Sequence, residues 1–276
     1  MSLMWLNGEL VPLAAARISP MDRGFTLGDG LFETMRVRAG WVMNLYAHMH
    51  RLVEGGRILG LPVPDTGAVR QALCELLDAT DIEEGSIRLT LSRGESPRGL
   101  LPPANTRSTL ALTASPGAFA RTTVRAITSG LIRRDETSPL SRIKSLNYLP
   151  GILARQEAAR ANAEEALLLN MQGRVAESTI STIIVASEDG ELTTPPVSEG
   201  ALPGVARGVL LARGLVREAP LENEQILWAR GVWLVNTLSL REVTVLDGQA
   251  LATDPVLTET LAACFDTASD TWADGP

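Results

Sequence analysis

The sequence is poor in lysine, histidine, cysteine and aromatic residues. Only one of its 276 residues is a lysine, Lys144, against 24 arginines, and only two are histidines. Arginine replaces lysine well as a surface charge, but it cannot replace a lysine that must lose its proton and act as a nucleophile. A compositional bias towards arginine would account for the missing lysines. The single lysine that remains is either a chance survivor of that bias or a candidate for chemistry.

Charge and hydropathy exclude several classes of protein. The net charge is −7, aromatic residues make up 4% of the chain, and the arginines are scattered rather than clustered, so nucleic-acid binding is not expected. No apolar run approaches the roughly 18 residues of a membrane span. The N-terminus lacks a basic segment, and Asn7 and Glu9 interrupt its apolar stretch, so we expect no signal peptide and a soluble cytoplasmic protein.

The two cysteines predict neither a disulfide framework nor a metal site. Cys74 and Cys264 lie alone in apolar, helix-like stretches, and we expect both to be buried thiols.

Length and composition allow one large domain or two of medium size, because 45% of the residues are hydrophobic and can form a large core. The short, turn-rich stretch 114–120 lies between two strand patterns and is the best candidate for a domain boundary. We predict an N-terminal domain over residues 1–119 and a C-terminal domain over 120–276 that carries Lys144. Strands and helices occur in both halves, which predicts an α/β (α+β) fold.

Two hairpins are predicted near the N-terminus, one over residues 3–11 with an Asn-Gly turn and one over 31–45 around Ala39-Gly40. The predicted helices cover 46–59, 66–77 with Asp65 as cap, 149–161, 205–213 and 255–268. The further predicted strands cover 87–91, 109–113, 124–128, 166–169, 179–186 and 232–235.

The two histidines do not support common hydrolytic schemes. A serine triad would need His48 or His50 as its base, and no Gly-x-Ser-x-Gly elbow is present. A metal site built on His-x-His is possible, but two positions apart on a helix the side chains point in different directions. Structural or surface histidines are the simpler interpretation.

Lys144 lies between a loop and a predicted helix start, where its amine could form a Schiff base with a carbonyl. Pyridoxal phosphate is the commonest protein-bound partner for such an amine. Glu177 could face the pyridine nitrogen, the helix start after Gly204 could bind a phosphate, Arg51 could add positive charge, and Arg98 could grip a carboxylate. Taken alone, each also fits an ordinary turn, helix start or exposed side chain.

In their order along the chain, these pieces resemble the class IV aminotransferase family, the fold-type IV pyridoxal phosphate enzymes. The similarity is greatest to the branch of 4-amino-4-deoxychorismate lyase and D-amino-acid aminotransferase. It rests on seven segments: Asp-Arg-Gly-Phe-Thr-Leu-Gly-Asp-Gly-Leu-Phe-Glu-Thr (22–34), His-Met-His-Arg-Leu (48–52), Ser-Arg-Gly with Arg-Gly (92–94 and 98–99), Lys-Ser-Leu-Asn-Tyr-Leu (144–149), Glu-Ser (177–178), Gly-Val-Ala-Arg (204–207) and Asn-Thr-Leu-Ser-Leu-Arg-Glu-Val (236–243).

The resemblance implies roles for the matching residues. Lys144 would be the Schiff-base lysine and proton shuttle, and Arg98 would be a carboxylate contact. It also implies a small N-terminal α/β domain and a larger barrel-like C-terminal domain, with the cofactor between them and a homodimer interface completing the site. The remaining cofactor contacts would be Arg51, Tyr148, Glu177, Val205, Ala206 and Ser239.

The sequence departs from the family pattern at four positions. Thr182 replaces an asparagine, and Ala206 replaces a frequent threonine, which removes one hydroxyl donor for the phosphate. Leu27 stands where an aromatic residue is usual, and Leu100 stands where the lyase pattern often has tyrosine. Lys144 and the acid are retained, so the departures at Leu27 and Leu100 bear on the substrate rather than on the cofactor.

Three functions follow from the resemblance. The first is a lyase that converts 4-amino-4-deoxychorismate to 4-aminobenzoate and pyruvate in the folate pathway. The second is an aminotransferase acting on branched-chain or D-amino acids, with the same lysine and acid. The third is a non-catalytic homologue that binds pyridoxal phosphate. All three imply a small-molecule substrate or ligand that carries an amino group, and the resemblance also implies a homodimer.

Overall fold

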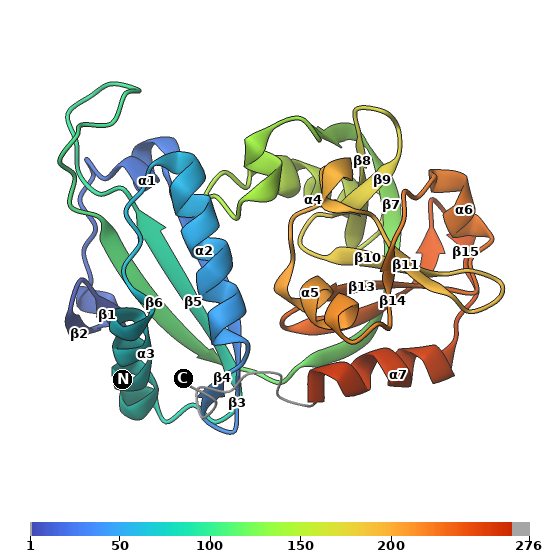
Figure 1. Cartoon of the computed structure of the whole chain (residues 1–276), viewed down its shortest axis with the longest axis horizontal. Coiled ribbons are helices and arrows are strands. Elements are labelled where there is room, and N and C mark those ends of the chain that lie inside the picture. The colour runs from blue at the N-terminus through green and yellow to red at the C-terminus, as the bar shows by residue number, and fades with distance from the viewer. Residues whose placement is uncertain (1, 267–276) are drawn as a thin grey trace. The chain divides into compact units, whose positions relative to one another are not determined.

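The computed structural model describes residues 2–266, which form two compact units (Figure 1). Unit 1 contains the described residues up to 118 together with 143–147, and unit 2 contains 119–142 and 148–266. Lys144 was expected in the C-terminal domain, whereas the short segment 143–147 that contains it belongs to unit 1. The domain boundaries predicted from the sequence stay a prediction.

Unit 1 is built on a six-stranded antiparallel sheet in the order β2-β1-β6-β5-β3-β4. The first hairpin is confirmed, and the second is confirmed except that its return strand stops at Val42. The strands are β1 (Leu3–Leu6), β2 (Glu9–Pro12), β3 (Gly30–Arg38), β4 (Trp41–Val42), β5 (Gly85–Ser92) and β6 (Thr109–Pro116).

Two helices, α2 (Leu45–Leu59) and α3 (Thr66–Thr80), pack on this sheet through one apolar core (Figure 1). In β3 the alternate residues Leu31, Met35 and Val37 belong to that core, as the period-2 geometry of a strand requires. The same alternation places the carboxylate of Glu33 on the core-facing side of β3. A short helix, α1 (Arg23–Leu27), precedes the sheet.

Cys74 is exposed, which makes its predicted burial wrong, whereas Cys264 is buried as expected. The buried face of α3 includes Val69, Leu73 and Leu76, and one residue beyond Leu73 the helix has turned by about 100° away from the sheet. The predicted Asp65 cap is confirmed, because its carboxylate accepts a hydrogen bond from Ala68 N at 2.9 Å.

Unit 2 is built on a mixed nine-stranded sheet in the order β12-β11-β10-β13-β14-β7-β8-β9, with β15 paired to β14, among the described residues (Figure 1). Its strands are β7 (Ala120–Arg134), β8 (Glu165–Asn170), β9 (Val175–Ser178), β10 (Thr182–Ala186), β11 (Leu192–Thr194), β12 (Arg217–Glu218), β13 (Gly231–Asn236), β14 (Ser239–Leu246) and β15 (Gln249–Ala250). Its helices are α4 (Leu149–Arg160), α5 (Val205–Ala212), α6 (Asn223–Leu227) and α7 (Pro255–Asp266). The described residues also include the 3₁₀ turns η1 (Leu13–Ala15) in unit 1, and η2 (Pro139–Arg142) and η3 (Val197–Glu199) in unit 2.

Both faces of this sheet are covered, so its central strands are apolar throughout. In β10, Ile183 and Val185 contribute to one core, and Ile184 and Ala186 contribute to the core shared with α5 and α7. A strand buried on both faces shows no alternation of polar and apolar residues.

Two expectations about connections hold only in part. The linker expected within 114–120 is confined to residues 117–119, because Ala114 to Pro116 belong to β6 and Ala120 begins β7. The predicted strand 179–186 begins only at Thr182. Its first residues form a turn in which Ser178 N donates to Ser181 O at 2.8 Å and Ser181 N donates to Ser178 Oγ at 3.1 Å. The last helix matches the prediction to Asp266, and residues 267 and 268 lie outside the described residues.

Candidate active site

Lys144 is held against the edge of the unit 1 sheet by backbone hydrogen bonds. Phe32 N donates to Lys144 O at 2.9 Å, and Leu146 N donates to Gly30 O at 3.0 Å, so residues 144–146 run along β3. The Lys144 amine lies 4.2 Å from the centroid of the Phe32 ring. The face of an aromatic ring attracts an ammonium group, so this contact positions the Lys144 side chain over Phe32.

A buried charged network fills the core-facing side of β3 next to α2. His48 Nδ1 lies 2.6 Å from Glu33 Oε2, and Arg51 donates to the same carboxylate from Nε at 2.8 Å and from Nη2 at 2.5 Å. His48 and Arg51 are neighbours on the surface of α2 because they lie three positions apart. His50 is exposed, so the two histidines point in different directions, as expected.

The charges in this network determine its protonation. Burial raises the pKa of Glu33, but the charge and hydrogen bonds of Arg51 and the hydrogen bond from His48 outweigh burial and lower that pKa to about 2. Burial lowers the pKa of His48, and the charges of Arg51 and Lys144 lower it further against the opposing effect of Glu33. His48 is therefore neutral near pH 7 and donates from Nδ1 to Glu33. Its Nε2 is buried and has no hydrogen-bond partner among the described residues.

Glu177 in unit 2 is oriented by a charged partner and a backbone amide. Its Oε1 lies 2.9 Å from Arg134 Nε, and its Oε2 accepts from Leu202 N at 2.9 Å. Arg134 in turn donates to Gly200 O at 3.0 Å and to Ser141 O at 2.8 Å. The guanidinium of Arg134 donates along fixed directions, so its bonds to these two carbonyls orient it, and it in turn orients the carboxylate of Glu177. Arg134 was not among the residues expected from the sequence, because no short-range signal connects residues 134 and 177.

The start of α5 meets polar residues from the neighbouring strands of unit 2. Gly204 is the N-cap of α5, and a Cβ at this position would lie 3.0 Å from Thr182 Oγ1. Thr182 pairs with Val235 on β13, and Ser239 Oγ donates to Asn236 Oδ1 at 3.2 Å in the turn that follows. The first amides of α5, at Val205 and Ala206, therefore lie in the same neighbourhood as these hydroxyl groups. Exposed helix amides with hydroxyl donors are suited to bind an anion.

Arg207 points away from this neighbourhood. It is buried and donates to Pro195 O at 3.0 Å, and it pairs with Glu218. Its place in the Gly-Val-Ala-Arg segment is thus explained by packing of α5 rather than by an anion.

Tyr148 is the N-cap of α4, whose first turn also approaches the turn after Glu177. A Cβ at Gly151 would lie 3.4 Å from Thr179 O and 3.8 Å from Tyr148 Cδ1. Unit 2 therefore brings Tyr148 close to the segment that carries Glu177.

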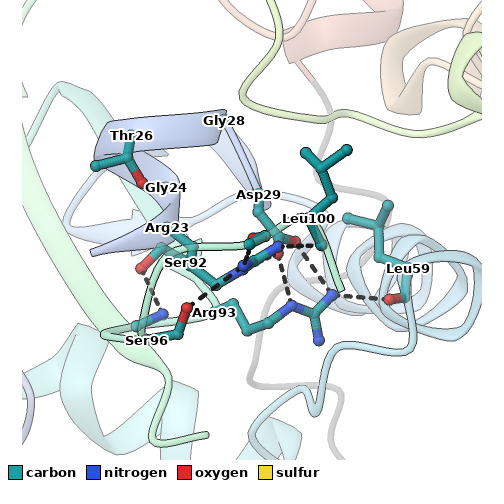
Figure 2. Close-up of polar contacts among 12 residues, drawn as sticks. Arg23, Gly24, Thr26, Gly28, Asp29, Leu59, Ser92, Arg93, Ser96 and Leu100 are labelled. Atoms are coloured by element: carbon teal, nitrogen blue, oxygen red, sulfur yellow. Dashed lines mark hydrogen bonds and ion pairs between the residues drawn. The ribbon is translucent and has the colours of Figure 1, made fainter. Parts of the chain in front are cut away.

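The two residues predicted to contact the substrate, Leu27 and Arg98, are exposed in unit 1. Leu27 ends α1, and Arg98 lies in the loop after β5. Arg93, Arg23 and Asp29 form a largely buried cluster beside this loop, as Figure 2 shows. The sequence offered no reason to expect a role for these three residues. The pairing of two arginines with one aspartate depends on residues far apart in the chain.

Among residues 2–266, no group of three or more histidine, cysteine, aspartate or glutamate side chains could hold a metal ion. No helix in the same part of the chain is long and apolar enough to cross a bilayer.

Comparison with known proteins defines the class. The family model described as amino-transferase class IV matches residues 30–245, and the chain belongs to this family. Its fold is a mixed α/β fold of fold type IV, as expected.

Three similar proteins illustrate the range of the family. The chain is 31% identical to a putative branched-chain-amino-acid aminotransferase of Methanocaldococcus jannaschii, over 90% of this chain and 89% of that protein. It is 29% identical to a bifunctional aminodeoxychorismate lyase / D-amino acid transaminase of Mycobacterium tuberculosis, over 95% and 97% of the two chains. A solved structure of a hypothetical aminotransferase from Mycobacterium tuberculosis, in a PLP-bound form, superposes with a TM-score of 0.84 at 27% identity, over 97% and 98% of the two chains.

The cofactor of this enzyme is pyridoxal phosphate, and the residues of the chain fit it. Unit 1 offers the only lysine amine of the sequence next to an apolar ring, with the unpartnered Nε2 of His48 in the adjoining network. Unit 2 offers an oriented carboxylate at Glu177 and the α5 amides after Gly204, where a side chain would crowd Thr182. These groups are the amine that attaches such a cofactor, the acid for its ring nitrogen and the hydrogen-bond donors for its phosphate.

Proposed function

We propose that the protein is a pyridoxal phosphate-dependent 4-amino-4-deoxychorismate lyase that releases 4-aminobenzoate and pyruvate. The observation that carries this proposal is the Ser-Arg-Gly…Arg-Gly loop, which presents Arg98 as an exposed cation on an anchored backbone next to α1. The substrate has carboxylates that a guanidinium can bind. The likeness to the bifunctional lyase and transaminase, which extends over nearly the full length of both chains, supports the same choice.

Each candidate site residue has a proposed role. Lys144 attaches the cofactor, removes a proton from the amine-bearing carbon of the substrate and returns it to the departing three-carbon fragment. Pyridoxal phosphate, when bound, supplies the electron sink for that carbon. Glu177 pairs with the pyridine nitrogen and Tyr148 lies near the ring. Arg51, the amides of Val205 and Ala206, and Ser239 bind the phosphate, while Arg98 and Leu27 face the substrate.

Arg51 needs a particular arrangement to serve the phosphate. The Nε and Nη2 of Arg51 donate to Glu33, so the two side chains form a buried ion pair without net charge. Arg51 would then act on the phosphate through the dipole of this pair.

The second candidate is an aminotransferase for branched-chain or D-amino acids. The 31% identity to the putative branched-chain enzyme favours it, and it uses the same lysine and acid. The two reactions differ in stoichiometry. The two products of the lyase contain every atom of its substrate, so it turns over without an acceptor, whereas a transaminase stops after one amino group per site until a 2-oxo acid is added.

Purified holoenzyme with 4-amino-4-deoxychorismate and no 2-oxo acid tests the proposal. We expect many turnovers with equal amounts of 4-aminobenzoate and pyruvate, and none in Lys144→Arg. If instead no 4-aminobenzoate forms, while L- or D-amino acids convert the bound cofactor to its aminated form with stoichiometric oxo-acid release, the enzyme is a transaminase and the lyase assignment is wrong.

We also propose that the enzyme is a homodimer in the cytoplasm, as its likeness to the family implies. Sedimentation equilibrium of the holoenzyme measures the assembly, and a mass of one chain across the accessible concentrations would contradict it.

A further inference from the structure

The loop that carries Arg98 is irregular and yet held in place. Pro97, Arg98, Gly99 and Leu100 are all exposed, and the loop forms no strand from Pro97 to Ser108. A loop of this kind normally samples many conformations, which would spread the Arg98 guanidinium over a wide volume. Something must restrict the backbone on both sides of Arg98 if this side chain is to bind a carboxylate with useful affinity.

The side chain of Arg23, from the start of α1, supplies that restriction. Its Nη1 donates to Gly99 O at 2.8 Å and lies 3.4 Å from Ser96 Oγ, and its Nη2 donates to Leu100 O at 2.7 Å. These acceptors flank Arg98 on both sides along the chain. Arg23 itself is only 5% exposed in its side chain, so these bonds form with little competition from water.

Asp29 fixes the orientation of the Arg23 guanidinium. Asp29 Oδ2 accepts from Arg23 Nε at 2.7 Å, while Arg93 donates to the same carboxylate from Nε at 2.8 Å and from Nη2 at 3.1 Å (Figure 2). Burial raises the pKa of Asp29, but its hydrogen bonds and ion pairs with Arg93 and Arg23 outweigh burial and lower that pKa. The carboxylate is thus ionised at neutral pH and forms ion pairs with both arginines.

The remaining donors of Arg93 serve a different part of unit 1. Its Nη1 donates to Gly60 O at 2.9 Å and its Nη2 to Leu59 O at 2.8 Å, at the C-terminal end of α2. The two arginines therefore share one carboxylate but bind different carbonyls. Arg23 binds the loop beyond Ser96, and Arg93 binds the end of α2, which makes them a natural pair for comparison.

The base of the loop has its own separate anchor in Asp22. Its Oδ2 accepts from Ser92 Oγ at 2.7 Å and from Thr109 Oγ1 at 2.8 Å, and Arg23 N donates to Gly94 O at 2.8 Å. These contacts close the two ends of the loop without reaching Arg98. Loss of the Arg23 guanidinium would consequently release the middle of the loop while its ends stay attached.

We propose that Arg23 is a positioning residue: its guanidinium, oriented by Asp29, fixes residues 96–100 so that Arg98 is presented in one place to the carboxylate of the substrate. This inference rests on the proposed function of Arg98. Arg23 acts through the loop backbone and does not itself touch the substrate.

Arg23→Lys tests the proposal because an ammonium keeps the ion pair with Asp29 and cannot span both carbonyls. The bond after Arg98 is a trypsin site in an exposed loop, and cleavage there reports how often this segment opens. We expect cleavage after Arg98 to become about tenfold faster, since charge-assisted hydrogen bonds are lost. Cleavage after the exposed Arg213 in unit 2 serves as the internal standard and should not change.

The same variant should raise KM for the carboxylate-bearing substrate about tenfold and leave kcat nearly unchanged, because binding that is equal in the ground and transition states is lost. The long-wavelength absorption of the lysine-bound cofactor should be that of the wild type. Arg93→Lys changes the contacts of the Asp29 carboxylate but not the bonds from Arg23 to Gly99 and Leu100. This variant should leave cleavage after Arg98 close to the wild-type rate.

Two results would overturn the proposal. One is an Arg23→Lys enzyme with unchanged cleavage after Arg98, and the other is equal acceleration in Arg93→Lys. Failure of the proposed function is distinguishable: Arg98→Ala with an unchanged KM would remove the substrate role of Arg98, whereas the cleavage rates would still report whether Arg23 holds the loop.

Discussion

The two units supply their candidate site residues by different physical means. Unit 1 uses long charged side chains that neutralise one another in the interior, in the pair of Glu33 with Arg51 and in the cluster around Asp29. At the start of α5, unit 2 uses backbone amides and small hydroxyl groups, with Thr182 beside the helix N-terminus and Ser239 in the turn after β13.

The four departures that the resemblance to the family implies are consistent with this difference. Two departures, Thr182 and Ala206, fall in the amide-rich region of unit 2, where backbone N–H groups remain whichever side chain is present. The other two, Leu27 and Leu100, are exposed in unit 1. None falls on a buried charged residue of unit 1, since removal of one partner would leave an uncompensated buried charge.

Lys144→Arg would separate chemistry from charge most completely. We expect activity to fall by about a thousandfold or more, because arginine keeps the positive charge but cannot act as nucleophile or proton shuttle. Borohydride reduction followed by mass spectrometry measures cofactor attachment, which should be lost while the melting temperature stays near that of the wild type. Retained covalent cofactor in this variant would contradict the assignment.

The buried pair of unit 1 should appear in the pH dependence of stability. The pKa of Glu33 is lowered to about 2, so its stabilising contribution is complete above the usual glutamate pKa near 4.5 and is lost as the pH falls towards 2. This corresponds to about 3 kcal/mol of unfolding free energy. Urea unfolding across this range measures it.

Glu33→Gln is the control for that measurement. It should be less stable than the wild type by about 3 kcal/mol at neutral pH, because Arg51 loses its buried counter-charge. The difference between the two proteins should shrink as the pH approaches 2. A difference that stays constant with pH would show that Glu33 is not the titrating group.

Glu177→Gln tests the one charged candidate residue of unit 2, whose other candidates at the start of α5 are backbone amides and hydroxyl groups. We expect kcat to fall about a hundredfold with the cofactor still attached, since the amide keeps the shape of the side chain and loses its charge. Steady-state kinetics with Glu188→Gln, an exposed site in the same unit, provides the matched comparison. Equal effects of the two substitutions would mean that Glu177 has no special role.

Ser239→Ala should have the smallest effect, because the α5 amides would remain to bind the phosphate. We expect cofactor affinity to fall about tenfold, the value of one hydrogen bond to a charged group of about 1.5 kcal/mol. Fluorescence titration with pyridoxal phosphate measures this, with the exposed Ser198→Ala as control. A loss above a hundredfold would contradict the idea that backbone amides dominate in unit 2.

Local patterns predicted most elements, and they failed where a distant partner decides. The first hairpin, α2, α4 and α5 follow from turn residues, helical spacing and proline placement within a few neighbours. The turn at residues 179–181 has strand-like residues, yet hydrogen bonds between Ser178 and Ser181 fold it back. Cys74 lies in an apolar segment, but the packing direction of α3 decides its exposure.

The candidate site shows the same division. Lys144, Glu177 and the start of α5 are recognisable from residue type and local order, because a nucleophilic amine has no substitute in this chain. The partners that orient them are not recognisable: Arg134 lies 43 positions before Glu177, Asp29 lies 64 positions before Arg93, and Glu33 belongs to a strand while its partners belong to a helix.

The sequence by itself therefore determined the chemistry that is available: one amine, an acid, a helix start for an anion, and a chain able to form α/β units. Only the tertiary structure decided which charges neutralise one another, since the pairing of buried ions depends on strands and helices brought together by the apolar core. It also placed Lys144 beside β3 in unit 1, through backbone hydrogen bonds that its sequence position does not reveal.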